Sequence, residues 1–347
     1  MKRVCILGHF GHDENLLNGQ TIKTKIITKG LIDQLGNEEV QTIDTHGGAK
    51  ALPKCFLQLG KAFKNSKNII MLPAQNGVKV FAPIMLFWKM IFHRKLHYIV
   101  IGGWLPELLK SNVRLANKLK RFDAIYVETS TMKKALEEQG FENILILPNC
   151  KDLKILREKE LVYNTGEPYK LCTFSRVMKE KGIEDAIEAV KKINNEEGRT
   201  VFTLDIYGQV DSEQTEWFDN LQKTFPEYVT YGGLVPFDKS VEVLKNYFAL
   251  LFPTRFYTEG IPGTIIDAYA AGVPVISAKW ESFDAVVEEG TVGIGYEFGD
   301  LKAIYDVLFQ AFNNPKQLLD MKINCLEKAK GYTSEVTIGL IINNLKG

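Results

Sequence analysis

Glu259 and Asp267 are two carboxylates with seven residues between them, in the stretch TEGIPGTIIDAYAAGVPVI, which changes from Gly- and Pro-rich to helical. Glu259 falls in the loop, and Asp267 lies about one turn into a helix that starts near Pro262 or Gly263. The first N–H groups of a helix lack partners within it and favour an anion such as a diphosphate. We therefore interpret the stretch as an anion-binding helix start flanked by two acids. The alternative is that the Gly and Pro residues only form the loop before a buried helix and that Asp267 is exposed to solvent.

Basic residues follow a predicted strand in the stretch FSRVMKEKG. Arg176 and Lys181 come after the strand and before a helix, so they are expected at the carboxyl end of the strand. An Arg provides a fork of donors and a Lys a point charge, and both suit the oxygens of a nucleotide diphosphate. The alternative is a solvated turn, which fits Lys179 and Lys181 better than Arg176, because Arg176 follows the strand directly.

Short apolar runs alternate with helical patterns along the chain, which predicts parallel sheets with helices on both faces. Strands are expected at 4–7, 40–43, 69–72, 98–101, 124–127 and 144–147, and helices at 21–35 and 130–140. A polar stretch, 148–168, predicts a linker. Beyond it, strands are expected at 171–174, 202–207, 229–231, 250–252 and 275–276, and helices at 185–193, 213–224, 238–247 and 264–271.

This pattern predicts an α/β protein of two doubly wound, Rossmann-like domains that face a cleft. The domains are expected at 1–150 and 165–330. The last helix, 334–345, has no strand after it, and we expect residues 331–347 to cross back onto the first domain. Ligands of open α/β sheets bind beyond the carboxyl ends of the strands, which makes the cleft the expected site.

Together these motifs resemble the retaining glycosyltransferases of family four (group 1), which have the GT-B fold. The family pattern E-G-x-P-x-x-x-x-E-A-x-A-x-G reads here Glu259, Gly260, Ile261, Pro262, Asp267, Ala268, Ala270 and Gly272. FSRVMKEKG is similar to the Arg and Lys that bind the diphosphate in the family, and the resemblance covers residues 171–295. In three places the chain departs from the family: its second acid is Asp, no His follows the fourth strand in Ile101-Gly102-Gly103-Trp104, and Pro148-Asn149-Cys150 replaces P-N-G.

The resemblance implies transfer of a hexose-type sugar from a nucleotide-diphosphate donor to an acceptor hydroxyl, with retention of configuration. Arg176, Lys181 and the helix start would stabilise the leaving diphosphate, and Glu259 would bind sugar hydroxyls. Asp267 would bind the ribose, and the main chain of Gly19 would lie near the β-phosphate. The other donor contacts are assigned to Gly208, Gly232, Gly233, Leu234, Gly260, Ile261, Pro262, Gly263 and Thr264. The sequence has no Asp-x-Asp pair, which predicts a metal-independent enzyme with no cofactor besides its donor.

The first domain is expected to bind the acceptor. His9 and His12 follow the first strand, and Trp104, at the end of the fourth, could stack on a sugar. His46, His93 and His97 are expected at the surface or at interfaces rather than as ligands.

The net charge of the chain is +1 and its pattern of five cysteines contains no CxxC pair. An even charge balance argues against a nucleic-acid binder, and an odd number of thiols suits the cytoplasm. However, the segment from Lys50 to Arg121 has 14 basic residues and one acid, Glu107, whereas the rest has 29 basic and 41 acidic residues. Within the segment lies the apolar run VFAPIMLFWKMIF. This combination predicts peripheral contact with an anionic membrane surface, on the inner face of the cell membrane; the alternative is a core helix with solvated lysines.

The function predicted from these observations is a sugar transferase of bacterial surface polysaccharide synthesis, of the capsule or O-antigen type. Its acceptor would be a glycan carried on a polyprenyl diphosphate. Two alternatives stay open on the sequence alone: another GT-B nucleotide-sugar enzyme, such as an epimerase or a phosphorylase-like protein, and a nucleotide-binding partner subunit that has lost catalysis.

Overall fold

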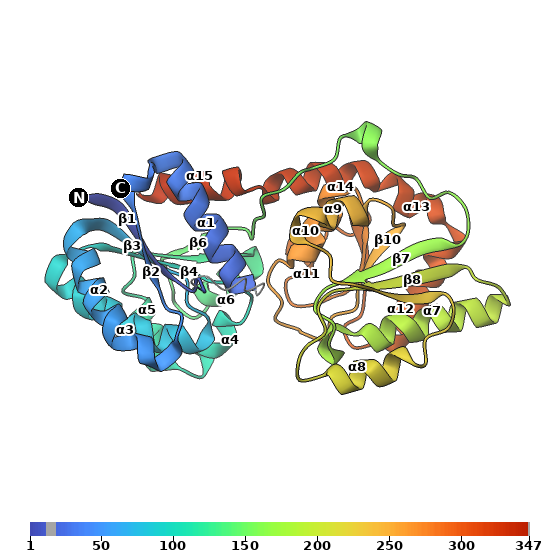
Figure 1. Ribbon diagram of the computed structural model, residues 1–347, viewed down its shortest axis with the longest axis horizontal. Helices are drawn as coiled ribbons and strands as arrows, with labels where there is room; N and C mark the ends of the chain where they lie inside the picture. The colour runs from blue at the N-terminus through green and yellow to red at the C-terminus, as the bar shows by residue number, and fades with distance from the viewer. Residues whose placement is uncertain (12–18, 346–347) are drawn as a thin grey trace. The chain divides into compact units, whose positions relative to one another are not determined.

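The structure is a computed structural model that describes residues 1–11 and 19–345 (Figure 1). It divides into two compact units. Unit 1 consists of Met1–Asp152 together with Tyr332–Gly347, and unit 2 is Leu153–Gly331. Each unit is built around one six-stranded sheet in which all paired strands are parallel.

The sheet of unit 1 has the order β2-β1-β3-β4-β5-β6. Its strands are β1 (Lys2–Gly8), β2 (Val40–Asp44), β3 (Ser66–Met71), β4 (Lys95–Ile99), β5 (Ala124–Val127) and β6 (Ile144–Ile146). Its helices are α1 (Gly19–Leu35), α2 (Leu52–Asn65), α3 (Gln75–Phe92), α4 (Leu105–Lys110), α5 (Val113–Leu119), α6 (Ser130–Glu137) and α15 (Ser334–Leu345).

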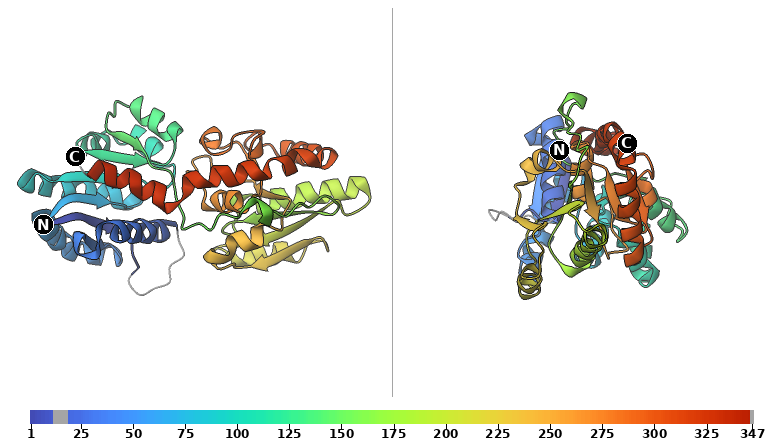
Figure 2. Two further views of the ribbon diagram at one scale, coloured as in Figure 1. Left: turned by 90° about the horizontal axis from the view of Figure 1, so that it is seen from above. Right: turned by 90° about the vertical axis from the view of Figure 1, so that its right-hand side faces the viewer.

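Two hydrophobic clusters cover the two faces of this sheet. One cluster joins the strands to α2, α3, α5 and α6. The other joins them to α1 and α15, with Ile27 and Leu31 of α1 buried beside Ile338 and Ile341 of α15. The last helix of the chain therefore completes the first unit, where it lies next to α1 (Figure 2).

The sheet of unit 2 has the order β12-β11-β10-β7-β8-β9. Its strands are β7 (Tyr169–Phe174), β8 (Phe202–Tyr207), β9 (Val229–Gly233), β10 (Ala249–Phe252), β11 (Val275–Ala278) and β12 (Gly293–Tyr296). Its helices are α7 (Ile183–Glu197), α8 (Thr215–Gln222), α9 (Ser240–Leu244), α10 (Gly263–Ala270), α11 (Phe283–Val286), α12 (Leu301–Asn313), α13 (Pro315–Asp320) and α14 (Lys322–Ala329).

The connections fix where each sheet can bind a ligand. In unit 2 the chain runs from β7 to β9 on one side of β7, then crosses to β10 on the other side. Ligands of doubly wound sheets bind at such a reversal, beyond the carboxyl ends of the strands. The turns after β7 and β10 meet there, and the equivalent point of unit 1 lies between β1 and β3.

The predicted α/β architecture is confirmed, and the differences concern individual elements. Sequence reasoning missed β12, and it placed the fourth strand at 98–101 where β4 spans Lys95–Ile99. The apolar run 80–92 lies in α3, which buries Phe81, Met85 and Leu86 in the core. Within residues 1–11 and 19–345, no helix combines the length and the apolarity needed to cross a bilayer.

Candidate functional site

The turn after β7 carries both predicted cations. Arg176 follows the strand by two residues, and its side chain is half exposed and lies 3.4 Å from Asp211. Lys181 ends a short 3₁₀ turn, Lys179–Lys181, and Gly182 follows with a φ of 69°. A Cβ at Gly182 would lie 1.9 Å from the carbonyl oxygen of Pro253. Only glycine therefore lets this turn approach the turn after β10.

The loop after β10 is held against the turn after β7 by Arg255. The backbone N–H of Arg255 donates to the carbonyl of Glu180 at 2.8 Å. Its guanidinium donates to both carboxylate oxygens of Asp185 on α7, at 2.9 and 2.6 Å, and this paired bond raises the pKa of Arg255. A guanidinium that donates two hydrogen bonds to one carboxylate fixes the orientation of the two side chains as well as the distance between them.

These turns bring Lys181 and Glu259 together. The Nζ of Lys181 donates to Oε1 of Glu259, and the same oxygen accepts from Oγ1 of Thr254 at 3.1 Å. Both charged side chains are 17% exposed. The ammonium also lies 5.5 and 5.0 Å from the ring centres of Phe252 and Phe256. The site therefore holds one cation and one carboxylate in fixed, largely desolvated positions, where electrostatic effects exceed those in water.

Helix α10 supplies the other residues of the acidic motif. Its first residue is Gly263, after Pro262 at the N-cap, and no side chain caps it. Thr264 follows, and its hydroxyl is inaccessible and has no hydrogen-bond partner within the described residues. Asp267 lies one turn further on and is 4% exposed, so the alternative of a solvent-exposed Asp267 is wrong. Ile261 and Gly260, before the helix, are buried.

The predicted base-binding glycines lie at the same edge of the sheet, with Gly208 in the turn after β8 and Gly232 and Gly233 at the end of β9. Gly208 follows β8 with a φ of 138°, and a Cβ there would lie 1.8 Å from the carbonyl oxygen of Ser175. Its N–H donates to the carbonyl of Gly233, and its carbonyl accepts from the hydroxyl of Tyr231. Gly232 lies over the ring of Tyr207, and Leu234 is exposed. The turns after β7, β8 and β9 are thus joined through Gly208.

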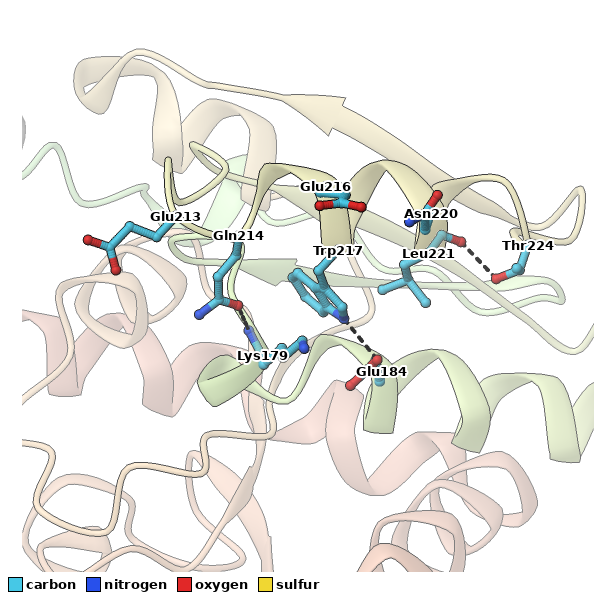
Figure 3. A pocket seen from close by; sticks show the side chains of 9 residues that line it. All are labelled: Lys179, Glu184, Glu213, Gln214, Glu216, Trp217, Asn220, Leu221 and Thr224. Atoms are coloured by element: carbon cyan, nitrogen blue, oxygen red, sulfur yellow. Dashed lines mark hydrogen bonds between the residues drawn. The ribbon is translucent and has the colours of Figure 1, made fainter.

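Gln214 is a positioning residue that sequence reasoning missed. Its Oε1 accepts from the backbone N–H of Lys179 at 2.9 Å, and its Nε2 donates to Glu180, which lowers the pKa of that carboxyl. It lines a pocket of about 570 Å³ beside α8 (Figure 3). In the same pocket the indole Nε1 of Trp217 donates to Glu184 at 2.9 Å. Gln214, at the N-cap of α8, therefore holds the turn that carries Lys181 in place.

In unit 1, two of the three predicted acceptor residues, His9 and Trp104, lie among the described residues. The Nδ1 of His9, after β1, lies 2.8 Å from the hydroxyl of Thr21. Gly19 begins α1, and a Cβ at this position would contact no other described residue within 4 Å. The indole N–H of Trp104 donates to the carbonyl of Ile101. His12 lies outside the described residues.

His46 belongs to this cluster, although sequence reasoning did not join it to His9. The Nδ1 of His46 lies 3.3 Å from the Nε2 of His9. Oδ1 of Asp44, at the end of β2, accepts from the backbone N–H groups of Phe10 and His46. The sequence does contain a signal for this contact, because Asp44 directly follows the strand expected at 40–43 and stands two residues before His46.

A second polar pair at this edge was also missed. Lys23 of α1 and Glu128, after β5, form a buried ion pair of 2.6 Å in which each side chain is 3% exposed. Glu128 also accepts from the N–H of Gly102, after β4. Buried ion pairs of this kind fix positions more than they add stability.

The expectation that His97 lies at the surface or an interface is wrong. His97 is on β4 and 2% exposed, and its ring contacts Asn68 at 3.1 Å and the hydroxyl of Tyr126 at 3.3 Å. Burial lowers its pKa to about 4, so the ring is neutral at physiological pH. Its place is in the core because it alternates with apolar neighbours on a central strand.

Comparison with known proteins bears on both units. Residues 168–314 match the family model of group 1 glycosyl transferases. The amylovoran biosynthesis glycosyltransferase AmsK of Erwinia amylovora is 24% identical over 149 residues, which are 42% of this chain and 36% of AmsK. The match therefore spans only about a third of that relative.

Solved structures resemble the chain along its whole length. Anabaena HepE in complex with UDP is 16% identical, with a TM-score of 0.77 and full coverage of both chains. The sucrose-phosphate synthase of Thermosynechococcus elongatus is 14% identical, with a TM-score of 0.77 over 100% of this chain and 98% of the other. The pneumococcal O-GlcNAc transferase GtfA is 18% identical, with a TM-score of 0.64 over 84% of this chain and 59% of the other. These comparisons show that the chain has the GT-B fold of these proteins and that residues 168–314 match the group 1 glycosyl transferases.

Proposed function

We propose that this protein transfers a hexose-type sugar from a nucleotide-diphosphate donor to an acceptor hydroxyl, with retention of the anomeric configuration. The observation that carries the proposal is the juxtaposition of Lys181, Glu259 and the uncapped start of α10 at the chain reversal of unit 2. A diphosphate needs cations and free N–H donors, and a sugar needs a carboxylate for its hydroxyls. This edge of the sheet offers all three.

The roles of the residues follow from their positions. Lys181, Arg176 and the N–H groups at the start of α10 would stabilise the negative charge that grows on the leaving diphosphate. Glu259 would bind hydroxyls of the donor sugar, and Asp267 those of the ribose. The leaving phosphate would accept the proton of the acceptor hydroxyl, so the mechanism needs no separate base and no metal ion.

We propose UDP as the nucleotide of the donor. HepE has been solved with UDP and with UDP-glucose, and GtfA with UDP and GlcNAc. The base would be bound by the main chain of Gly208 and the turn Gly232–Leu234, because the hydrogen bonds that join these turns hold their backbones in place.

Unit 1 would bind the acceptor through His9, His46 and Trp104. The relative AmsK acts in amylovoran biosynthesis, which supports a role in polysaccharide synthesis. We propose a lipid-linked acceptor, a glycan on a polyprenyl diphosphate, and a cytoplasmic protein bound to the inner face of the cell membrane.

The support for membrane contact comes from a surface of unit 1 that we call the α2–α3 face. It consists of exposed apolar side chains, Leu57, Phe87, Met90 and Ile91, and exposed lysines of α2, Lys54, Lys61 and Lys64. Phe56 and Phe87 stack at 5.9 Å, so the two helices form one continuous surface. Apolar side chains ringed by lysines suit the interface of an anionic bilayer.

The function is tested in two steps. A thermal-shift screen of UDP, GDP and ADP should show the largest stabilisation with UDP, and UDP-hexoses carrying a radioactive sugar should then label a polyprenyl-diphosphate glycan. Tight UDP binding without transfer to any acceptor would instead support an inactive partner subunit. Hydrolysis or epimerisation of the donor without an acceptor would support a different nucleotide-sugar enzyme.

Membrane contact is tested by flotation with phosphatidylcholine vesicles, with and without phosphatidylglycerol. The protein should float with the anionic vesicles only, and Met90→Ser/Ile91→Ser should reduce recovery. Leu301→Ser/Ile323→Ser, which removes two exposed apolar side chains from unit 2, is the matched control. Equal recovery on both vesicle types, or none on either, would contradict the proposal.

A further inference from the structure

Unit 1 has a cavity at the edge of its sheet where the strands begin, opposite the edge that carries the predicted acceptor residues. The cavity has a volume of about 670 Å³, which is the size of a small-molecule site. It is lined by residues at the starts of β1, β3 and β4, three neighbouring strands of the sheet. The residues assigned to the donor and the acceptor lie at carboxyl ends, so this cavity is separate from them.

The lining is strongly cationic. Four of the side chains that line the cavity are cationic, those of Arg3, Lys67, Arg94 and Lys95, and one is a carboxylate, that of Glu39. Like charges that converge on one cavity repel one another, and an anion bound among them removes that repulsion.

Part of this charge has a structural reason. The carboxyl-terminal ends of helices α2 and α3 lie beside the cavity. The carboxyl-terminal end of a helix carries a partial negative charge and therefore favours nearby cations. Arg94 serves this purpose, because its Nε donates to the carbonyl of Phe63 near the end of α2. Arg94 is thus paired, whereas the other three cationic side chains are not. Those of Arg3, Lys67 and Lys95 form no hydrogen bond or ion pair with any of the residues that the structure describes. Arg3 and Lys95 are also half-buried, so their charges are only partly solvated.

We propose that this cavity is a binding site for a phosphate group, either of a soluble phosphorylated compound or of a lipid headgroup. The forked donors of Arg3 and the point charges of Lys67 and Lys95 are the chemistry that recognises phosphate oxygens. The excess of cations over Glu39 matches an anion with more than one negative charge.

The neighbourhood is compatible with both sources. The last turn of α3 leads directly into the cavity through His93 and Arg94, and it carries the exposed side chains of Met90 and Ile91. A lipid phosphate in the cavity would place its acyl chains next to these apolar residues. A soluble compound would use the cavity alone. The site is independent of the donor chemistry proposed for unit 2, so it stands or falls separately from the transferase function.

The experiment uses the full chain and Lys67→Gln/Lys95→Gln, which removes two charges that bind nothing in the described chain. The control is Lys25→Gln/Lys134→Gln, which removes two exposed lysines of unit 1 that are likewise unpaired among the residues described. Thermal melts confirm that both variants fold. Binding of inorganic pyrophosphate is measured by calorimetry in saturating UDP, which blocks the donor site, and flotation is measured on phosphatidylcholine vesicles with and without phosphatidylglycerol.

Two results support the proposal and identify the source. Pyrophosphate binding that survives UDP and weakens by about fivefold for each lysine replaced, in the cavity variant alone, indicates a soluble phosphate. Absence of pyrophosphate binding, with anionic flotation lost in the cavity variant alone, indicates a lipid headgroup. The proposal is overturned if wild-type protein binds neither probe, or if the cavity variant binds like wild type or like the control.

Discussion

The ammonium of Lys181 and the carboxylate of Glu259 form an ion pair across the turns after β7 and β10 of unit 2. Thr254 donates to the same carboxylate oxygen, and Thr254 is 2% exposed. Glu259 therefore has a fixed orientation before any donor binds, and Lys181 has a partner that a diphosphate would have to replace. The two side chains can be tested separately because their proposed targets, phosphate and sugar, are different parts of the donor.

Glu259→Gln should separate binding from transfer. Loss of the carboxylate frees Lys181 for the diphosphate, so we expect UDP affinity to stay the same or rise, while turnover falls by about 100-fold or more. Lys181→Gln should instead weaken UDP binding by about 2 kcal/mol, the value of a charged hydrogen bond. Calorimetry with UDP and a sugar-transfer assay check both variants. UDP binding that falls equally in both would show that the pair serves the fold and not the donor.

Arg176→Ala should weaken UDP binding by about tenfold, because among the described residues the guanidinium of Arg176 has one ion pair, a long contact of 3.4 Å to Asp211, which leaves its other donors for phosphate. Arg199→Ala is the matched control, since Arg199 is exposed to a similar degree, 49% against 53%, and also pairs with a carboxylate. UDP affinity should not change in the control. Equal affinity in the two variants would remove Arg176 from the site.

Gly182→Ala should destabilise the protein more than Gly198→Ala. The two glycines flank α7 with φ values of 69° and 63°, so a side chain at either costs about 1 kcal/mol of backbone strain. Only Gly182 meets an obstacle, the carbonyl of Pro253, and overpacking adds about 2 kcal/mol there. Urea unfolding measures the difference. Equal losses would mean that the turns after β7 and β10 do not need their close approach.

Lys322 gives unit 2 a stability that rises at alkaline pH. Lys322 is fully buried, donates to the carbonyls of Gly272 and Tyr247, and has a pKa that burial lowers from 10.5 to about 8. Between pH 8 and 10.5 the unfolded chain binds a proton there that the folded chain has released, so the free energy of unfolding increases with pH.

The comparison with Lys322→Met isolates this effect. The wild type should gain about 3 kcal/mol over the variant from pH 8 to 10.5, because each unit of pKa shift corresponds to about 1.4 kcal/mol. Urea unfolding at several pH values measures the gain. A difference that stays constant with pH would place the lysine pKa near its ordinary value.

Transfer should survive removal of divalent metal ions. The charge on the diphosphate would be met by Lys181, Arg176 and the start of α10, so EDTA should leave turnover unchanged. The control is EDTA with added Mn²⁺ or Mg²⁺. Turnover that EDTA abolishes and either metal restores would contradict the proposed mechanism.

The sequence predicted the architecture because its strands have recognisable patterns, with continuous burial in β5 and alternating burial in β8. Strands such as β5 and β8 read as short, apolar or alternating runs, and their observed bounds, Ala124–Val127 and Phe202–Tyr207, agree with expectation. Strand β12 was missed because Gly293 and Gly295 carry no apolar signal. Glycine is required there: a Cβ at position 293 would lie 2.4 Å from the carbonyl of Val275.

The polar residues of the sites were predictable only where they follow one strand in the sequence. Arg176 and Lys181 lie in the turn between β7 and α7, and Glu259 lies in the Gly- and Pro-rich loop before α10. The contacts of Gln214 with Lys179 and of His46 with His9 join different strand ends. These contacts could not be predicted, because the two residues of each pair are separated by a helix and a strand. The periodicity of the sequence does not determine the lengths of those elements to within a residue.

Helix α15 has a consequence for the order in which the protein acquires its structure. It packs on α1, where a Cβ at Gly30 would lie 2.5 Å from Ile338, and it buries Ile27 and Leu31. Synthesis on the ribosome delivers all of unit 2 before this helix exists. The apolar side of α1 therefore stays uncovered through most of translation, and the first unit to begin is the last to be completed.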